Sequence, residues 1–251
     1  MSAFTMKLFT LFLFSTAAFS VASYAAESTE PSENTAPSEN RWQGETELGF
    51  ALKEGNTKSN SLLAKIDTRY THNLWHYNII AQANSEATNH VTTEEEYNFS
   101  AQANRDLNET NYLLTRAAYE KKRFSGFDYE TSISFGYGYR VFQSPTGTMD
   151  LEIAPGYRNQ ALDDGEQIEG GILRAALQYH RDLSETASFD QSLSVEAGRK
   201  NTDSTLESSL KTAINSALSL KLAFLVEYQE TVPEDTKHAD QETTISIVYA
   251  F

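Results

Sequence analysis

Cysteine is absent from the 251 residues, so the chain can form neither a disulfide framework nor a thiolate site. Beyond the N-terminal segment it also lacks any run of about 20 apolar residues, which excludes a bundle of transmembrane helices. Basic residues are few: 20 Lys and Arg stand against 35 Asp and Glu, for a net charge of −15. Nucleic acid is therefore not expected as a partner, because phosphate binding requires a basic face.

The N-terminal segment has the three parts of a secretory signal peptide. Lys7 supplies the positive charge, residues 8–14 (LFTLFLF) form a short apolar core, and Ser23-Tyr24-Ala25 places small residues where a signal peptidase reads them. We therefore expect residues 1–25 to be a signal peptide and the rest of the chain to be exported. An uncleaved anchor is the alternative, but its apolar run is too short to span a bilayer.

Residues 26–40 contain no large apolar side chain and are rich in Ser, Glu, Pro and Asn. This composition predicts a disordered acidic spacer. From Arg41 to Phe251 apolar and polar residues then alternate with period two, which is typical of a strand with two different faces. The clearest stretch has one apolar parity: Tyr129, Ile133, Phe135, Tyr137, Tyr139 and Val141.

The alternation predicts about twelve strands, each long enough to cross a bilayer when tilted. They are expected near residues 41–53, 60–72, 74–86, 94–104, 111–122, 128–142, 148–158, 169–181, 186–198, 205–216, 218–230 and 240–251. An even number of strands predicts an all-β, antiparallel, up-and-down transmembrane β-barrel over residues 41–251, with both termini on one side. A water-soluble β-sandwich is the alternative, but it explains neither the uniform strand length nor the terminal Phe.

The links between the expected strands fall into two sets. Those at 105–110, 143–147 and 182–185 are short and contain turn formers. The links near 86–94, 159–168, 199–204 and 231–239 are longer and more charged, and we expect them to face outward. The hexapeptides 105–110 (RDLNET) and 181–186 (RDLSET) nearly repeat one another at turns on the same side. The reuse of good turn residues is the simpler reading of this repeat.

Aromatic residues gather at strand ends on the apolar parity, as in the girdles of membrane barrels. The chain ends on Phe251, and Tyr249, Ile247 and Ile245 share its parity. We expect Tyr249 and Phe251 to act as an assembly signal. The barrel assembly machinery would read this strand by adding it to its own sheet edge.

The sequence also resembles a known family, that of salt-induced outer-membrane proteins, whose function is not known. The matching motifs are residues 55–57 (GNT) with Ser59 and Ser61, 123–129 (RFSGFDY), 136–140 (GYGYR) and 155–158 (PGYR). The resemblance extends over roughly residues 41–251. It implies an outer-membrane barrel and implies no reaction or ligand.

The polar parity is expected to line the lumen, with charged side chains of both signs. The candidate lumen residues are Arg116, Glu130, Arg140, Glu152, Arg158 and Arg174. They would form either a charged channel or a lumen packed with ion pairs, and a dozen strands leave little free width, which favours packing. A hairpin centred near Thr146 would place Arg140 opposite Glu152, so we predict an ion pair between these two residues.

No catalytic, cofactor or metal site is expected from the sequence. The five histidines form no recognisable triad with Ser and a carboxylate. A barrel hydrolase with its site at the outer loops is the alternative reading, and its histidines would be His90 and His238. The nearby carboxylates would be Glu94, Glu95, Asp235 and Asp240.

These features predict a non-enzymatic barrel in the cell outer membrane, exported through the periplasm, with outer-membrane lipid around it. A structural or stress-related barrel, or a narrow pore for a small solute, fits them best. Because the charges are mixed, the sequence predicts no ion selectivity.

Overall fold

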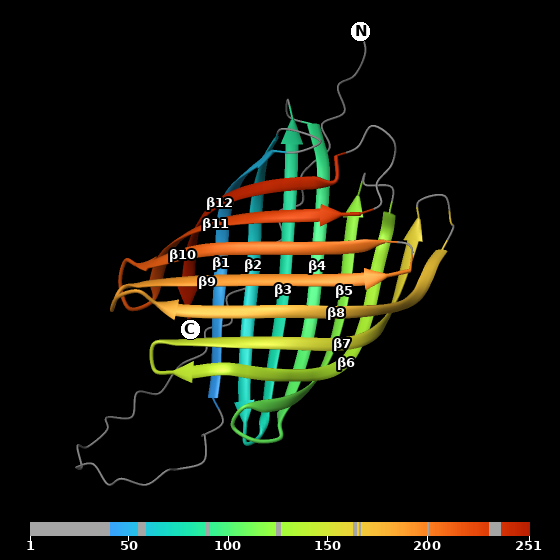
Figure 1. The fold of residues 1–251 in the computed structure, drawn as a ribbon. Helices are drawn as coiled ribbons and strands as arrows, with labels where there is room; N and C mark the ends of the chain where they lie inside the picture. The colour runs from blue at the N-terminus through green and yellow to red at the C-terminus, as the bar shows by residue number, and fades with distance from the viewer. Residues whose placement is uncertain are drawn as a thin grey trace, which may run out of the picture. The chain divides into compact units, whose positions relative to one another are not determined.

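The computed structural model describes residues 41–54, 59–88, 91–123, 127–162, 165, 167–199, 201–230 and 237–251. The expected signal peptide (1–25) and spacer (26–40), like His90, lie outside these residues. Twelve strands make up the fold (Figure 1). They are β1 (Arg41–Glu54), β2 (Ser59–His72), β3 (Trp75–Thr88), β4 (Val91–Asp106), β5 (Asn111–Arg123), β6 (Phe127–Ser144), β7 (Gly147–Leu162), β8 (Gln167–Asp182), β9 (Ala187–Gly198), β10 (Thr202–Ala213), β11 (Leu218–Gln229) and β12 (Ala239–Ala250).

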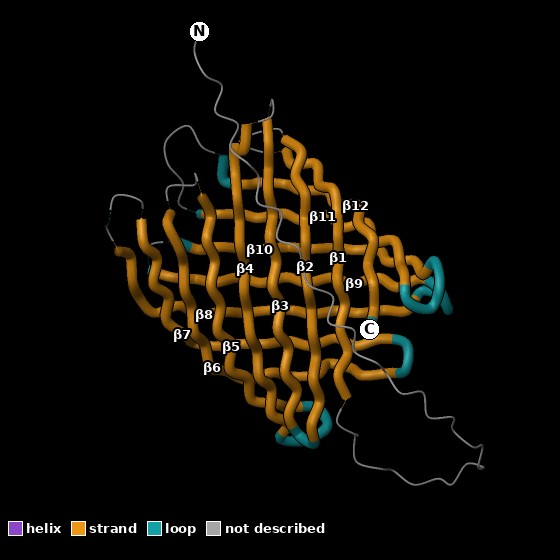
Figure 2. Tube along the Cα trace, turned by 180° about the vertical axis from the view of Figure 1, so that it is seen from behind, coloured by secondary structure: helices purple, strands orange, loops and turns teal. Residues whose placement is uncertain are grey.

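The strands close into one antiparallel barrel. Each strand pairs with its neighbours in sequence, and β1 pairs with β12 to complete the ring. The two walls of the barrel cross steeply in projection, because strands on opposite sides tilt in opposite directions (Figures 1 and 2). The predicted fold class, with twelve strands in up-and-down order, is confirmed. No helix in the described residues is long and apolar enough to cross a membrane.

The expected contrast between short turns and long loops is mostly wrong. The strands β1 to β8 are longer than their alternation suggested, up to 18 residues in β6, and this shortens most of the links, whereas β9 to β12 are no longer than predicted. β3 ends at Thr88 and β4 begins at Val91, where the sequence suggested a long loop over 86–94. Only the link between Gln229 and Ala239 remains long. Below, the turn end is the end of the barrel with the turns β2–β3, β4–β5, β6–β7, β8–β9 and β10–β11, and the loop end is the opposite one.

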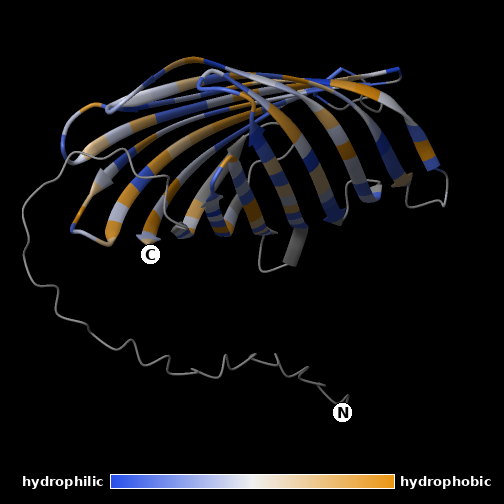
Figure 3. Ribbon diagram, turned by 90° about the horizontal axis from the view of Figure 1, so that it is seen from below, coloured by the Kyte–Doolittle hydropathy of each residue, from blue (hydrophilic) through white to orange (hydrophobic). Residues whose placement is uncertain are grey.

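The outer wall is apolar and the inner wall is polar. This is the opposite of a water-soluble protein, which has an apolar interior and a polar surface. Hydropathy alternates along each ribbon in Figure 3. On the outer face, Leu48, Ile66, Phe99, Ile133 and Ile245 are exposed. In the described residues, the only cluster of buried apolar side chains is Tyr112, Leu114 and Ala154, which lies on the inner face.

Aromatic side chains occupy both ends of the outer wall. At the turn end Trp42 stacks on Tyr70, Tyr70 on Tyr77, and Tyr77 on Trp75, across three neighbouring strands. At the loop end Tyr119 of β5 stacks on Tyr129 of β6. These two bands lie where the interfaces of a bilayer would meet the barrel.

The chain terminus completes the ring. Phe251 N–H donates to Gly44 O at 2.9 Å, and Gly44 N–H donates to Phe251 O at 2.9 Å. The Phe251 ring covers Gly44, because a Cβ built on that glycine would come within 2.3 Å of the ring. The last residue is thus hydrogen-bonded to β1 directly beyond the end of β12.

Candidate functional site: the charged lumen

The six candidate residues all lie on the inward parity of their strands, as the register shows. Arg116 of β5 pairs with Ser134, Glu130 of β6 with Gln160, and Glu152 of β7 with Ala176. Glu152, Arg158 and Arg174 are buried, and the other three are half-buried. The structure does not gather the six into one site: five of them are distributed over three clusters, and Arg116 lies on the inner face without belonging to any of the three.

Glu152 is the centre of the first cluster. Its carboxylate accepts hydrogen bonds from Arg174 Nη1 at 2.9 Å, Gln102 Nε2 at 2.8 Å and Tyr112 Oη at 2.9 Å. Gln102 belongs to β4, which is three strands away from β7 in the ring, so this contact reaches across the interior. Gly138 makes room for the Tyr112 ring, since a Cβ there would lie 2.1 Å from it.

The predicted ion pair between Arg140 and Glu152 is wrong. The β6–β7 turn is closed by Ser144 and Gly147, and the register shifts between Arg140 and Phe142. Together these two features move the pairing by two residues, so Arg140 lies opposite Asp150 and Glu152 lies opposite Gly138. A shift of two residues preserves the face, which is why both side chains still point inward.

Arg140 binds a different carboxylate. Its Nη2 donates to Asp106 Oδ1 at 2.6 Å, its Nη1 donates to Glu109 O at 3.2 Å, and its guanidinium lies 5.1 Å from the centre of the Tyr112 ring. Asp106 also contacts His76 Nε2 at 2.8 Å. These groups form the second cluster, which is at the turn end of the lumen.

Arg158 organises the third cluster, toward the loop end. It donates to Asp203 of β10 and to Asn201 O, and lies 3.9 Å from Glu130 Oε1. Glu130 accepts a hydrogen bond from Gln160 Nε2 at 2.7 Å. Since β7 and β10 are separated by two strands, this cluster also joins parts of the wall that are not neighbours.

Lysines form comparable contacts between β1, β10 and β11. Lys221 lies 3.1 Å from both Glu47 and Glu207, and Lys211 Nζ lies 2.6 Å from Glu45 of β1. Ser246 Oγ donates to Glu47 at 2.6 Å. Among the described residues, ion pairs therefore line both sides of the lumen.

Lys122 makes the longest connection across the barrel. Its Nζ lies 2.9 Å from Glu120, 3.5 Å from Glu96 and 3.7 Å from Glu227 Oε2. Glu227 is on β11 and Lys122 on β5, six strands apart in either direction round the ring. Two side chains can bridge opposite strands only where the barrel is flattened.

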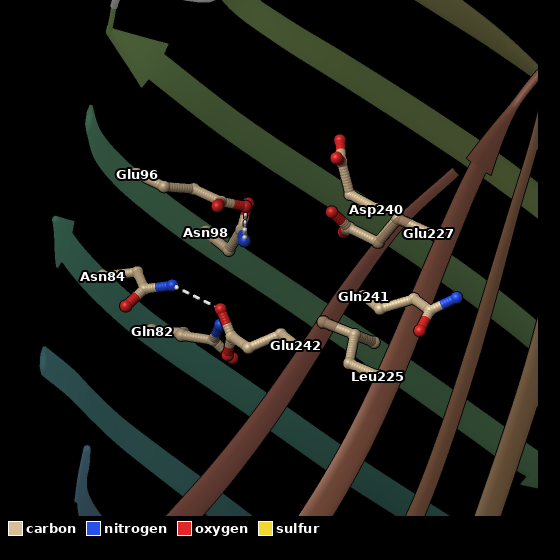
Figure 4. Close-up of a pocket in the computed structure, with 9 residues that line it drawn as sticks. All are labelled: Gln82, Asn84, Glu96, Asn98, Leu225, Glu227, Asp240, Gln241 and Glu242. Atoms are coloured by element: carbon tan, nitrogen blue, oxygen red, sulfur yellow. Dashed lines mark hydrogen bonds between the residues drawn. The ribbon is translucent and has the colours of Figure 1, made fainter. Parts of the chain in front are cut away.

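A small cavity lies beside this bridge and is lined almost entirely by polar groups (Figure 4). Asn84 Nδ2 donates to Glu242 Oε2 across it at 3.3 Å. Its volume is about 40 Å³, enough for only a few water molecules. A second hollow of about 160 Å³, between Asp182 and Ser219, lies at the turn end.

Sequence reasoning missed several of these lumen residues, among them Tyr112, Asp106, Asp203 and Lys122. Each lies on the inward parity of its strand, so the signal was present for Lys122, which shares the parity of Arg116 and Glu120. Tyr112 gave the opposite signal, because an aromatic side chain at a strand end suggests the outer girdle.

The histidines form no recognised catalytic arrangement in the part of the chain that the structure describes. Thr71 Oγ1, His76 and Asp106 form a chain of contacts, but Asp106 is already neutralised by Arg140. His180 lies between Asp182 and Asp190. His238 Nδ1 is hydrogen-bonded to Gln229 O at 2.9 Å. No group of three or more His, Asp or Glu in these residues could hold a metal ion.

Comparison with known proteins gives a family and a fold. The model of a family described as "Protein of unknown function, DUF481" matches residues 46–251. The chain is 26% identical over 219 residues to the uncharacterized protein YdiY of Escherichia coli K12, covering 87% of this chain and 86% of YdiY.

Two solved structures share the barrel architecture. The NanC porin matches with a TM-score of 0.56 at 6% identity, over 81% of this chain and 98% of that one. The translocator domain of autotransporter NalP from Neisseria meningitidis matches with a TM-score of 0.50 at 13% identity, over 84% and 88%. At these identities the likeness concerns the fold alone.

Proposed function

Because the chain belongs to the DUF481 family of proteins of unknown function and folds as a closed barrel, we propose that it is an outer-membrane barrel whose lumen is closed at rest. The apolar outer wall with aromatic bands at both ends supports the membrane location, since such a wall would be costly in water. The likeness of the fold to a porin supports it too.

The contact between Lys122 and Glu227 carries the proposal of a closed lumen. It joins strands on opposite sides of the ring, so a solute on the barrel axis would have to break it. The Arg158–Asp203, Gln102–Glu152 and Lys211–Glu45 contacts narrow the lumen at other levels. A structural barrel that passes water or small ions at most is the function that this interior supports best.

Conductance in a planar bilayer tests the closed lumen. The purified wild-type protein should give no stable steps over a range of voltages. A Lys122→Ala, Arg158→Ala variant, which loses two of the bridges, should give steps or a raised leak because the lumen widens. Asp128→Asn removes an exposed pair with Lys121 and should behave like wild type.

Stable, uniform steps from the wild-type barrel would overturn the closed-lumen proposal and favour a narrow pore. Silence from the double variant, in protein shown to be folded, would mean that these bridges do not close the lumen. Glu227→Ala serves as a second variant if the double variant does not fold.

A further inference from the structure

The near-repeat of RDLNET and RDLSET corresponds to one turn built twice. In the first copy, Leu107 N–H and Asn108 N–H both donate to Asn111 O, and Asn108 Oδ1 accepts from the N–H groups of Thr110 and Asn111. In the second, Leu183 and Ser184 donate to Ala187 O in the same way. Ser184 Oγ accepts from the N–H groups of Thr186 and Ala187. The β10–β11 turn repeats the pattern with Ile214 and Asn215.

Strand alternation gives each residue of the repeat a direction. The Asp of each copy, Asp106 or Asp182, is on the inward parity, and the Arg and Leu on either side of it are outward. Leu107 is 52% exposed and Leu183 is 59% exposed. Exposed aliphatic side chains recur around this end of the barrel: Leu74, Leu107, Leu183 and Ile214.

Arg105 and Arg181 each precede one of these leucines by two residues on the outward parity. They therefore lie nearer the middle of the barrel than the leucines, at the level of the aromatic band. Arg105 is paired with Trp75, and its guanidinium lies 5.8 Å from the centre of the indole ring. Arg181 is paired with Gly147, where a Cβ would come 3.1 Å from Arg181 Cδ, so the side chain lies along the wall. Among the described residues neither arginine has a carboxylate partner, whereas Arg140, Arg158 and Arg174 in the lumen each have one.

We propose that Arg105 and Arg181 bind the phosphates of anionic phospholipid headgroups in the leaflet at the turn end. The inference rests on the membrane location proposed above. If the bilayer ended above the arginines, four large aliphatic side chains would stand in water at the tips of the turns. If the interface reaches those tips, lipid covers the aliphatic side chains, and the arginines lie slightly deeper, from where their long side chains extend the guanidinium groups out to the headgroups.

The chemistry of arginine at this position favours binding to a phosphate group over exposure to water. Its planar donors match phosphate oxygens, and its stem packs on the apolar wall while the charge reaches the interface. Glu109 and Glu185 are in the turns themselves, beyond the leucines, so they do not stand between the arginines and the bilayer.

Trp75 is a built-in reporter beside Arg105, and the chain has only two tryptophans. In a Trp42→Phe background the fluorescence comes from Trp75 alone. The barrel would be refolded into phosphatidylcholine vesicles that contain a quarter phosphatidylglycerol, with bromine on the chains of one lipid or the other. We expect brominated phosphatidylglycerol to quench Trp75 as though enriched about five-fold beside it, equivalent to about 1 kcal/mol for one basic residue.

Three variants identify the cause of that enrichment. Arg105→Gln should abolish it, Arg105→Lys should keep most of it, and Lys121→Gln, at the other end of the outer wall, should leave it unchanged. Equal quenching by the two lipids in wild type would overturn the headgroup proposal and leave the membrane location standing. Absence of quenching by either lipid, in folded protein, would instead count against the membrane location.

Discussion

Glu152 is a carboxylate on which several lumen side chains converge. Three donors converge on it, from β4, β5 and β8. Glu152 and Arg174 are 8% and 6% exposed, so each charge depends on the other to offset the loss of water. The contact between Arg174 and Glu196, at 3.7 Å, is longer and cannot replace the one that Glu152 supplies.

Replacing Glu152 by Gln should lower the free energy of unfolding by about 3 kcal/mol. The amide retains the shape of the side chain but leaves the Arg174 charge buried without its main partner. Urea titration of the barrel in lipid vesicles, followed by tryptophan fluorescence, measures the change as a lower midpoint with an unchanged slope.

Asp128→Asn is the matched control for that measurement. Asp128 pairs with Lys121 at 3.3 Å, but both side chains are well exposed, so the loss should stay below about 1 kcal/mol. If Glu152→Gln cost no more than this control, the buried cluster would not contribute to stability.

At the scale of the element, the β1–β12 seam depends on a glycine facing an aromatic ring. Phe251 covers Gly44 and forms two backbone hydrogen bonds with it. An aromatic ring over a cross-strand glycine shields the exposed backbone of both strands. The terminal residue therefore contributes to the folded seam as well as to the expected recognition by the assembly machinery.

A double-mutant cycle tests the seam. Gly44→Val should impair folding in wild type, because its side chain displaces the Phe251 ring, and the same change in a Phe251→Ala background should cost less. The coupling free energy should be on the order of 1 kcal/mol. Additive effects in unfolding titrations would show that the ring and the glycine act independently.

Alternation along the sequence predicted the elements well and their pairing less well. A period of two fixes which face each side chain takes, so Arg116, Glu130 and Arg174 could be placed inward from sequence alone. It does not fix how far one strand slides past the next. The two-residue turn at Pro145 and Thr146 and the irregularity after Arg140 set that sliding, and neither changes the apolar pattern.

Contacts across the lumen are even harder to predict from the sequence than the pairing of neighbouring strands. Lys122 and Glu227 are 105 positions apart and meet only because the ring closes and flattens. The ends of the strands could not be predicted correctly from the sequence either. The polar residues at the loop ends of the strands are as compatible with paired backbone as with a loop. The sequence therefore predicts lumen composition, and the fold decides the partners.

At the scale of the whole molecule, closure leaves no free sheet edge. We expect the folded protein to resist heating in mild detergent and to migrate differently on a gel before and after boiling. Because every strand has two neighbours, no strand can peel away without breaking two ladders. Identical migration of boiled and unboiled samples, in protein shown to be folded by circular dichroism, would contradict a closed barrel.

The bridge from Lys122 to Glu227 also bears on the order of folding events. Strands on opposite sides of the ring come within reach only after the last seam has formed, so this ion pair is absent from any transition state with an open sheet. Glu227→Gln, which leaves the contacts of Lys122 with Glu120 and Glu96 in place, should therefore speed unfolding by about five-fold, for a pair worth about 1 kcal/mol, and leave the folding rate unchanged. Lys121→Met, beside Lys122 but on the outer face, should alter neither rate by more than about two-fold. Slower folding of Glu227→Gln with unaltered unfolding would mean that opposite walls meet before the ring is complete.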